Sequence, residues 1–137
     1  MNYSIYIQSG QIVKNINCVE DQIDIQLSEG EKYIVGNYPC EQYYIQDEIP
    51  ISIPSPPSSY CVFNYTTKTW DEDYNLAANA QQIQRNKLLY ESDWTQIPNN
   101  PLTPEQQTAW AVYRQELRDI TSQSGYPFNV VWPTPPA

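Results

Sequence analysis

The side chains that could do chemistry in this 137-residue chain are few. There is no histidine, so the most common general base and the most common metal ligand are both missing. Ser-His-Asp and Cys-His catalytic arrangements are therefore impossible within one chain. The three cysteines, Cys18, Cys40 and Cys61, are odd in number and lack metal-ligand spacing, which predicts reduced thiols. Since no P-loop and no G-x-G-x-x-G motif is present either, we expect no enzymatic activity, no metal and no cofactor.

The carboxylates occur in short clusters, which could in principle serve acid–base catalysis. A glycosidase, for example, needs two of them facing each other across a cleft. Asp47-Glu48 lies in a predicted turn, and residues 71–73 lie at a predicted helix start, where negative charge meets the positive end of the helix dipole. These positions predict solvated or helix-capping charges.

The charge balance argues against two classes of partner. The formal net charge is −9, and no basic stripe is available to neutralise nucleic-acid phosphates or to meet an anionic membrane. Residues 1–75 carry three lysines against eleven acids, whereas residues 76–137 are nearly neutral. No apolar run approaches the roughly 18 residues of a membrane span, and residues 1–10 do not resemble a secretory signal. We expect a soluble protein made in a cytoplasm.

Residues 2–53 show the period-two alternation of short, half-buried strands separated by turns. Pro50 marks the last of them as an edge strand. A Pro/Ser linker near residues 54–59 and one more hairpin up to Trp70 follow, so we predict a β-rich docking domain over residues 1–70. The predicted strands are residues 3–7, 11–16, 23–27, 33–35, 43–45 and 49–53.

A helical period begins after Asp71. Leu76, Ile83 and Tyr90 are seven residues apart with Ala80 between them, which predicts one helical face in a helix over residues 74–92. This helix opens a second predicted domain over residues 71–137.

The second helix, over residues 104–121, has a clear start, with Thr103 as N-cap, Pro104 at the first helical position and Gln106 completing a capping box. Its apolar stripe predicts the core of a helical hairpin. The stripe consists of Trp110, Tyr113, Leu117 and Ile120.

Twelve tyrosines and four tryptophans exceed the need of so small a core, and such side chains are enriched at protein interfaces. Beyond the second helix, prolines forbid regular helix, so we expect an extended tail with no way to bury its anchors against itself. The candidate partner-binding residues are Tyr43, Tyr44, Phe128, Val130, Val131 and Trp132.

Residues 83–133 carry a specific combination of motifs. The order is R-x-x-L-L-x-x-S-D-W-T-Q, a P-L connector, W-x-x-Y-R-Q-x-L-R-D-I and a final W-P. This combination resembles the phage tail-assembly-chaperone family, whose segments also end tail-fibre and other virion proteins. The matching residues read as fold makers more than catalytic groups. They are Arg85, Leu88, Leu89, Ser92, Asp93, Trp94, Trp110, Tyr113, Arg114, Leu117 and Arg118.

Physical roles can be assigned to part of the motif. Arg114 and Arg118 are four residues apart and share a helix face, with Asp93 and Asp119 as available partners. We expect Asp93 to cap the connector by accepting backbone N–H bonds. Trp94 is expected to pack with Trp110 in the angle of the hairpin.

Strands followed by helices predict an α+β fold, and the absence of catalytic motifs predicts a protein that acts by binding alone. The resemblance implies that it works in the phage tail. In the first reading it is a virion component of the tail or baseplate that connects or anchors tail fibres. In the alternative it is an assembly chaperone that binds a tail protein transiently and is absent from the mature particle. The implied partners are tail-fibre or baseplate proteins, with self-association as a further option, and neither nucleic acid nor membrane.

Overall fold

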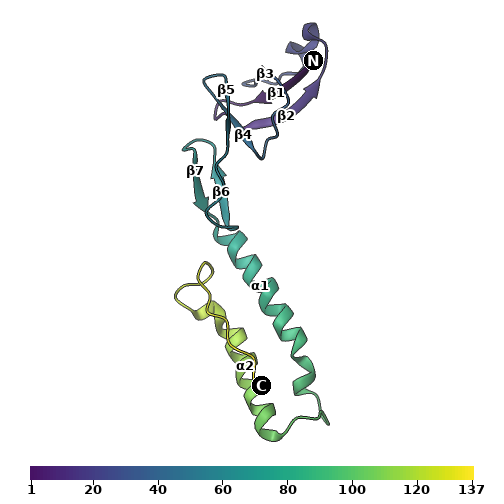
Figure 1. Cartoon of the computed structure of the whole chain (residues 1–137), viewed down its shortest axis with the longest axis vertical. Coiled ribbons are helices and arrows are strands. Elements are labelled where there is room, and N and C mark those ends of the chain that lie inside the picture. The colour runs from purple at the N-terminus through teal and green to yellow at the C-terminus, as the bar shows by residue number, and fades with distance from the viewer. The chain divides into compact units, whose positions relative to one another are not determined.

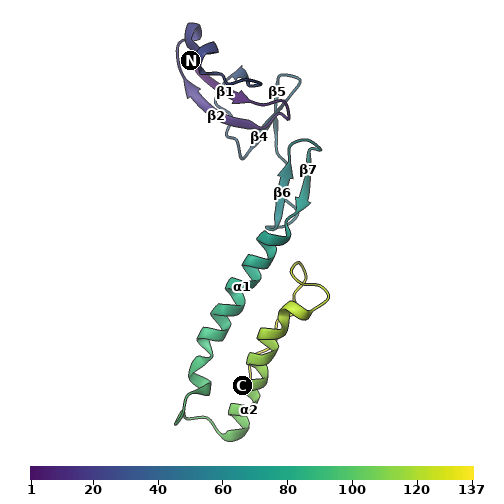
Figure 2. The same cartoon turned by 180° about the vertical axis from the view of Figure 1, so that it is seen from behind.

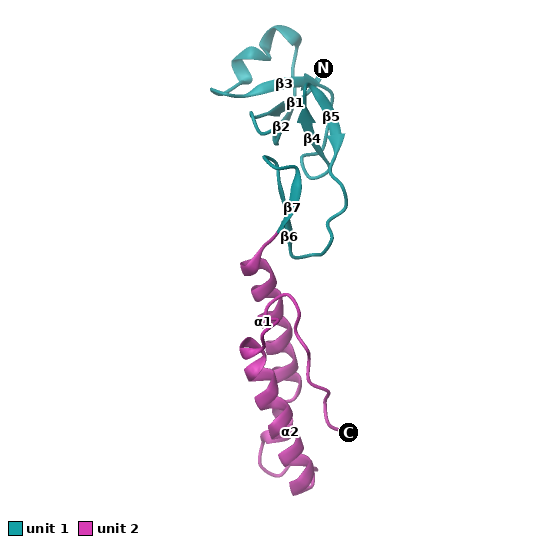
Figure 3. Ribbon diagram, turned by 90° about the vertical axis from the view of Figure 1, so that its left-hand side faces the viewer, with its two compact units in different colours: residues 1–71 teal, residues 72–137 magenta.

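The computed structural model describes all 137 residues and divides them into two compact units, residues 1–71 and residues 72–137 (Figure 3). The first unit is built from antiparallel strands and the second from helices, which confirms the predicted α+β class. No helix is long and apolar enough to cross a membrane.

The strand-rich unit contains three small sheets (Figure 1). β1 lies between β2 and β3, β4 pairs with β5, and β6 pairs with β7. Pro50 pairs with Ile45 in the two-stranded β4–β5 sheet, so it lies in an edge strand as predicted. The strands are β1 (Asn2–Tyr6), β2 (Ile12–Asn17), β3 (Lys32–Val35), β4 (Tyr43–Gln46), β5 (Ile49–Ser52), β6 (Cys61–Asn64) and β7 (Thr69–Glu72).

The core of this unit forms on both faces of β1, because alternate side chains of a strand point to opposite sides. Tyr3 and Ile5 pack with Ile23 in one cluster. Tyr6 packs with Ile12 and Ile45 in the other. The second cluster joins the β1–β2 hairpin to β4, and the Ile45 N–H donates to the Gly10 carbonyl at 2.9 Å.

The strand predicted over residues 23–27 is wrong. The segment forms two 3₁₀ turns, Glu20–Gln22 and Asp24–Gln26. Ile23 is buried in the core, and the half-buried Leu27 packs against it. Ile25 is exposed. The alternation had the period of a strand, but β2 and β3 already occupy both edges of β1, so the segment has no partner there.

The helical unit is an antiparallel pair, α1 (Tyr74–Glu91) and α2 (Pro104–Arg118), seen from both sides in Figures 1 and 2. The Asp73 carboxylate caps α1 by accepting from the Leu76 N–H at 2.8 Å. The capping box predicted at Thr103 and Gln106 is present in full. Short 3₁₀ turns, Asp93–Gln96 and Asp119–Ser122, follow the two helices.

The helices bury small and polar side chains of α1 against apolar ones of α2. Ala77, Ala78 and Gln81 are buried on α1. The face of α1 that carries Leu76, Ile83 and Tyr90 is instead exposed. On the second helix and the turn after it, the buried apolar side chains are Tyr113, Leu117 and Ile120.

The tail lies against the helical pair, which corrects the expectation that its anchors have no burial site within the chain (Figure 3). Pro127 is fully buried, and its carbonyl accepts from the Gln81 side chain at 3.0 Å. The rings of Tyr126 and Phe128 both meet the ring of Tyr74 edge-on. These contacts hold the start of the tail on α1.

Candidate partner-binding surfaces

A buried guanidinium joins the two helices near the connector. Arg114, on α2, donates to the Leu89 carbonyl at 2.6 Å, to the Ser92 hydroxyl at 2.8 Å and to the Asp93 carboxylate at 2.7 Å. Its side chain is 10% exposed, whereas that of Asp93 is 60% exposed. Asp93 therefore accepts from a side chain, and the structure does not show the predicted backbone cap. The Arg114 guanidinium therefore supplies hydrogen-bond donors to acceptors in the last turn of α1 and holds the start of the connector against α2.

Ser92 and Thr95, just after α1, add further hydrogen bonds to this network. The Ser92 hydroxyl also donates to the Leu88 and Leu89 carbonyls, at 2.8 and 3.1 Å. Thr95, the next buried polar residue, donates to the Ser92 carbonyl at 2.7 Å. No buried side-chain nitrogen or oxygen lacks a partner anywhere in the chain, so the connector is a rigid element.

Three aromatic rings form a row next to Arg114 and Asp93. The Trp110 ring lies 5.5 Å from that of Tyr113, edge-on, and 6.3 Å from that of Trp94. Tyr113 is buried, Trp110 is half-buried and Trp94 is exposed. Trp94 therefore contributes less to the core than the sequence suggested. Its side chain lies at the surface of the hairpin.

The other motif residues have plainer surroundings. Arg85 is half-buried and donates to the side chain of Asn86. Leu88 is half-buried, and Arg118 is exposed although it shares a helix face with Arg114. Of the two arginines, Arg114 reaches the connector, where it pairs with Asp93, one of the two acidic residues expected to be available.

The end of the tail presents apolar side chains from a fixed backbone. Both polar ends of the Gln123 side-chain amide bond the main chain of Val131, one as donor and one as acceptor, each at 2.8 Å. The Val131 side chain is nevertheless 77% exposed. Val130 and Trp132 on either side are half-buried. No local signal predicts this role of Gln123, because a glutamine after a helix is usually solvated.

The two tyrosines proposed for partner binding on β4 are covered. Tyr44 lies in the core, 5.6 Å from the Phe63 ring, and is therefore removed from the candidate surface. Tyr43 is half-buried with its ring edge-on to Tyr38.

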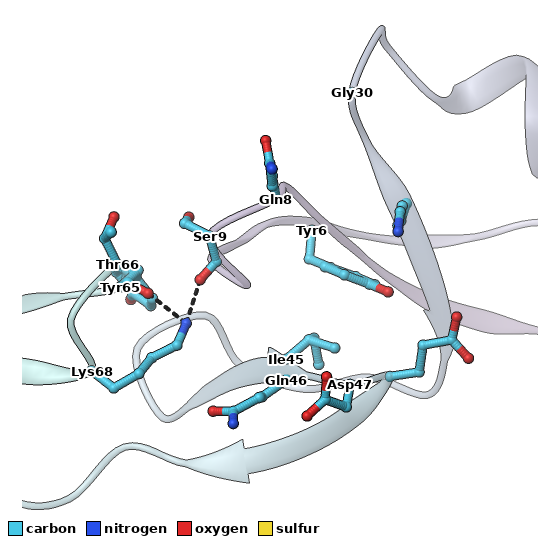
Figure 4. A pocket seen from close by; sticks show the side chains of 12 residues that line it. Tyr6, Gln8, Ser9, Gly30, Ile45, Gln46, Asp47, Tyr65, Thr66 and Lys68 are labelled. Carbon is cyan, nitrogen blue, oxygen red and sulfur yellow. Dashed lines mark hydrogen bonds between the residues drawn. The ribbon is translucent and has the colours of Figure 1, made fainter.

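The strand-rich unit also contains an open pocket of about 1140 Å³ (Figure 4). Lys68 reaches into its wall and donates to the carbonyls of Ser9 and Tyr65, with the ammonium 4.6 Å from the centre of the Tyr44 ring. Burial lowers the pKa of Lys68 below its ordinary value. The ammonium therefore links the turn at Ser9 to the turn at Tyr65. Asp47 and Glu48 also line the pocket, and no group of three or more metal-ligating side chains occurs in the chain.

Comparison with known proteins gives one match, which lies within the helical unit. Residues 78–137 match the model of a family described as phage tail assembly chaperone protein, which confirms the resemblance seen over residues 83–133. The match indicates a role in phage tail assembly. No curated protein and no solved structure matches the chain.

Proposed function

We propose that this chain, whose residues 78–137 match the phage tail assembly chaperone family, is a non-enzymatic component of the phage tail or baseplate that anchors tail fibres by protein–protein binding. Its binding partner is a tail-fibre or baseplate protein. The observation that carries the proposal is the fixed, exposed end of the tail at Val131.

The geometry of this segment suits an anchor. A flexible tail pays for ordering when it binds, but a backbone already held by the Gln123 amide avoids much of that cost. Prolines on both sides of residues 128–132 restrict the chain further. An exposed valine beside a half-buried tryptophan then offers apolar surface that a pocket in the partner can cover.

The alternative is a tail-fibre assembly chaperone that binds a tail protein transiently and is absent from the mature particle, a role that fits the same family match. Both functions use the same surface, because either requires a tail protein to be bound. They differ in where the chain is found at the end of assembly. Quantitative mass spectrometry of purified particles separates them. A fixed copy number per particle supports the component, and presence in the infected-cell lysate alone supports the chaperone.

We expect Val131→Asp to weaken binding of the tail partner by roughly 10–100-fold, since burying a valine side chain is worth about 1.5–3 kcal/mol and a charge cannot replace it. The measurement is the amount of each variant that co-purifies with tail proteins from phage-infected cells. The substitution keeps the main chain that Gln123 holds, which a deletion of residues 126–137 would not, because Pro127 belongs to the core of the helical unit.

Val112→Asp is the matched control, because Val112 is an exposed valine on α2, 54% accessible. It should co-purify like the unaltered chain. If both aspartate variants are recovered with tail proteins at the normal level, the tail segment is not the binding surface and the proposal fails.

A further inference from the structure

The exposed face of α1 is as regular as its buried face. Successive residues of an α-helix are about 100° apart, which places the five exposed-face residues within roughly 40° of one line along α1. Leu76, Ile83 and Tyr90 on this line are 43%, 63% and 80% exposed. We call this set the α1 stripe. Its members are Leu76, Ala80, Ile83, Lys87 and Tyr90.

The stripe has the spacing of a coiled-coil seam. The intervals between its members are four, three, four and three residues, the alternation that lets two helices interlock along a common line. Ala78, Gln81 and Ser92, which are buried in the helical unit, lie on the opposite side of α1. Four members of the stripe are exposed and Ala80 is half-buried, so the contact with α2 leaves most of the stripe free for a second helix.

We infer that the α1 stripe binds the α1 stripe of a second copy of this chain, with the two helices antiparallel. This inference goes beyond the binding of a tail protein and uses a different surface. A two-fold axis near Arg85 places Ala80 opposite the partner's Tyr90, and Ile83 opposite the partner's Lys87. Because the axis is two-fold, each of these contacts occurs twice.

Size and charge both favour this pairing. Ala80 leaves room for the tyrosine ring, and the aliphatic stem of Lys87 can lie along Ile83 with its ammonium in solvent beside Glu91, which is 3.9 Å away on the same helix. A parallel pair would instead set Lys87 against Lys87 and leave a gap between two alanines. The stripe therefore fits a second, antiparallel copy of itself in both size and charge. A different protein with a compensating charge is not needed.

The residues that flank the stripe add no repulsion. Asn79, Gln84 and Asn86 are neutral and polar, as the rim of a small interface should be. α1 is about 27 Å long, so the contact falls at the low end of specific interfaces, and we expect a dissociation constant on the order of 10–100 µM.

The test is sedimentation equilibrium of the purified full-length chain between about 5 and 500 µM, with no tail protein present. We expect a monomer–dimer equilibrium that Ile83→Lys weakens more than 10-fold, because the new ammonium faces the partner's Lys87. Ile83 is exposed, so circular dichroism should show the fold of this variant unchanged. Val112→Lys, on the exposed face of α2, should alter the constant less than 2-fold.

Disulfide trapping reports the direction of the helices. In a background with Cys18, Cys40 and Cys61 replaced by serine, a mixture of the Ala80→Cys and Tyr90→Cys chains should cross-link as a heterodimer. Ala80→Cys alone should stay monomeric. A chain that is monomeric at 500 µM, an equal response to Ile83→Lys and Val112→Lys, or cross-linking of Ala80→Cys with itself would each overturn the inference. Since Val131 is unchanged in all these variants, the result does not depend on the proposed binding of a tail partner.

Discussion

Replacing Arg114 by leucine should lower the free energy of unfolding of the helical unit by about 3 kcal/mol. Three acceptors lose this donor together: the Leu89 carbonyl, the Ser92 hydroxyl and the Asp93 carboxylate. The Leu89 carbonyl keeps its bonds from the Ser92 hydroxyl and N–H, so the cost is the loss of hydrogen bonds from a charged donor, which contribute roughly 1.5–3 kcal/mol each. Leucine fills part of the space but offers no donor, so the last turn of α1 and the connector lose their shared support.

The Asp93 contact is the smallest part of this effect. The carboxylate is 60% exposed and returns to water when the guanidinium is removed, as in surface ion pairs worth about 0–1 kcal/mol. Asp93→Asn should therefore cost less than about 1 kcal/mol. The larger cost belongs to the main-chain carbonyl and the serine hydroxyl, which cannot reach water without opening the hairpin.

Arg118→Leu is the control, because it removes the same charge from the same helix at an exposed position. We expect a change within about 0.5 kcal/mol, as for most surface substitutions. The measurement is urea unfolding followed by the helical circular dichroism signal. Equal midpoints for the two leucine variants would show that Arg114 does not clamp the hairpin.

The helix boundaries could be read from the sequence because their signals are local. Thr103, Pro104 and Gln106 satisfy the first N–H groups of α2 by themselves, whatever packs nearby. The two-residue alternation of the first strands was equally informative, because β1 is central and both its faces are buried. The same alternation failed at residues 23–27, where the missing information was which strand edges remained free.

The buried face of α1 could not be chosen from the sequence. Its most apolar line, through Leu76, Ile83 and Tyr90, is exposed, whereas the buried line includes Gln81. Gln81 serves there because its amide bonds the carbonyl of Pro127, 46 residues later. A polar side chain that is satisfied only by a distant segment looks like a surface residue until the fold is known.

Only part of the role of Arg114 could be predicted, again because it depends on contacts with a distant segment. Charge and spacing made Asp93 an available partner, but they did not distinguish Arg114 from Arg118. The position of α2 against α1 decides which arginine reaches the connector. The motif thus predicted the helical hairpin, but the contacts that each motif residue makes depend on how the two helices pack.

Replacing Gly10 by alanine should destabilise the strand-rich unit by more than about 3 kcal/mol, the other large effect that we expect. Gly10 has a φ of +80°, and a Cβ there would lie 2.0 Å from the Ile45 carbonyl oxygen. The oxygen is backbone and Ile45 is buried in the core, so neither can move away cheaply. Relief requires β4 to separate from the β1–β2 turn, which breaks the 2.9 Å bond from the Ile45 N–H to the Gly10 carbonyl.

Gly30→Ala provides the matched comparison, because Gly30 has nearly the same φ, +82°, with nothing within 4 Å of its would-be Cβ. It carries only the conformational cost of a left-handed alanine, about 1–2 kcal/mol. The difference between the two variants therefore isolates the steric contact with Ile45. Hydrogen–deuterium exchange of the amides of β1 and β2, read by mass spectrometry, should show strong loss of protection for Gly10→Ala and little for Gly30→Ala. Similar exchange in both variants would mean that the β1–β2 turn and β4 are not packed as closely as described.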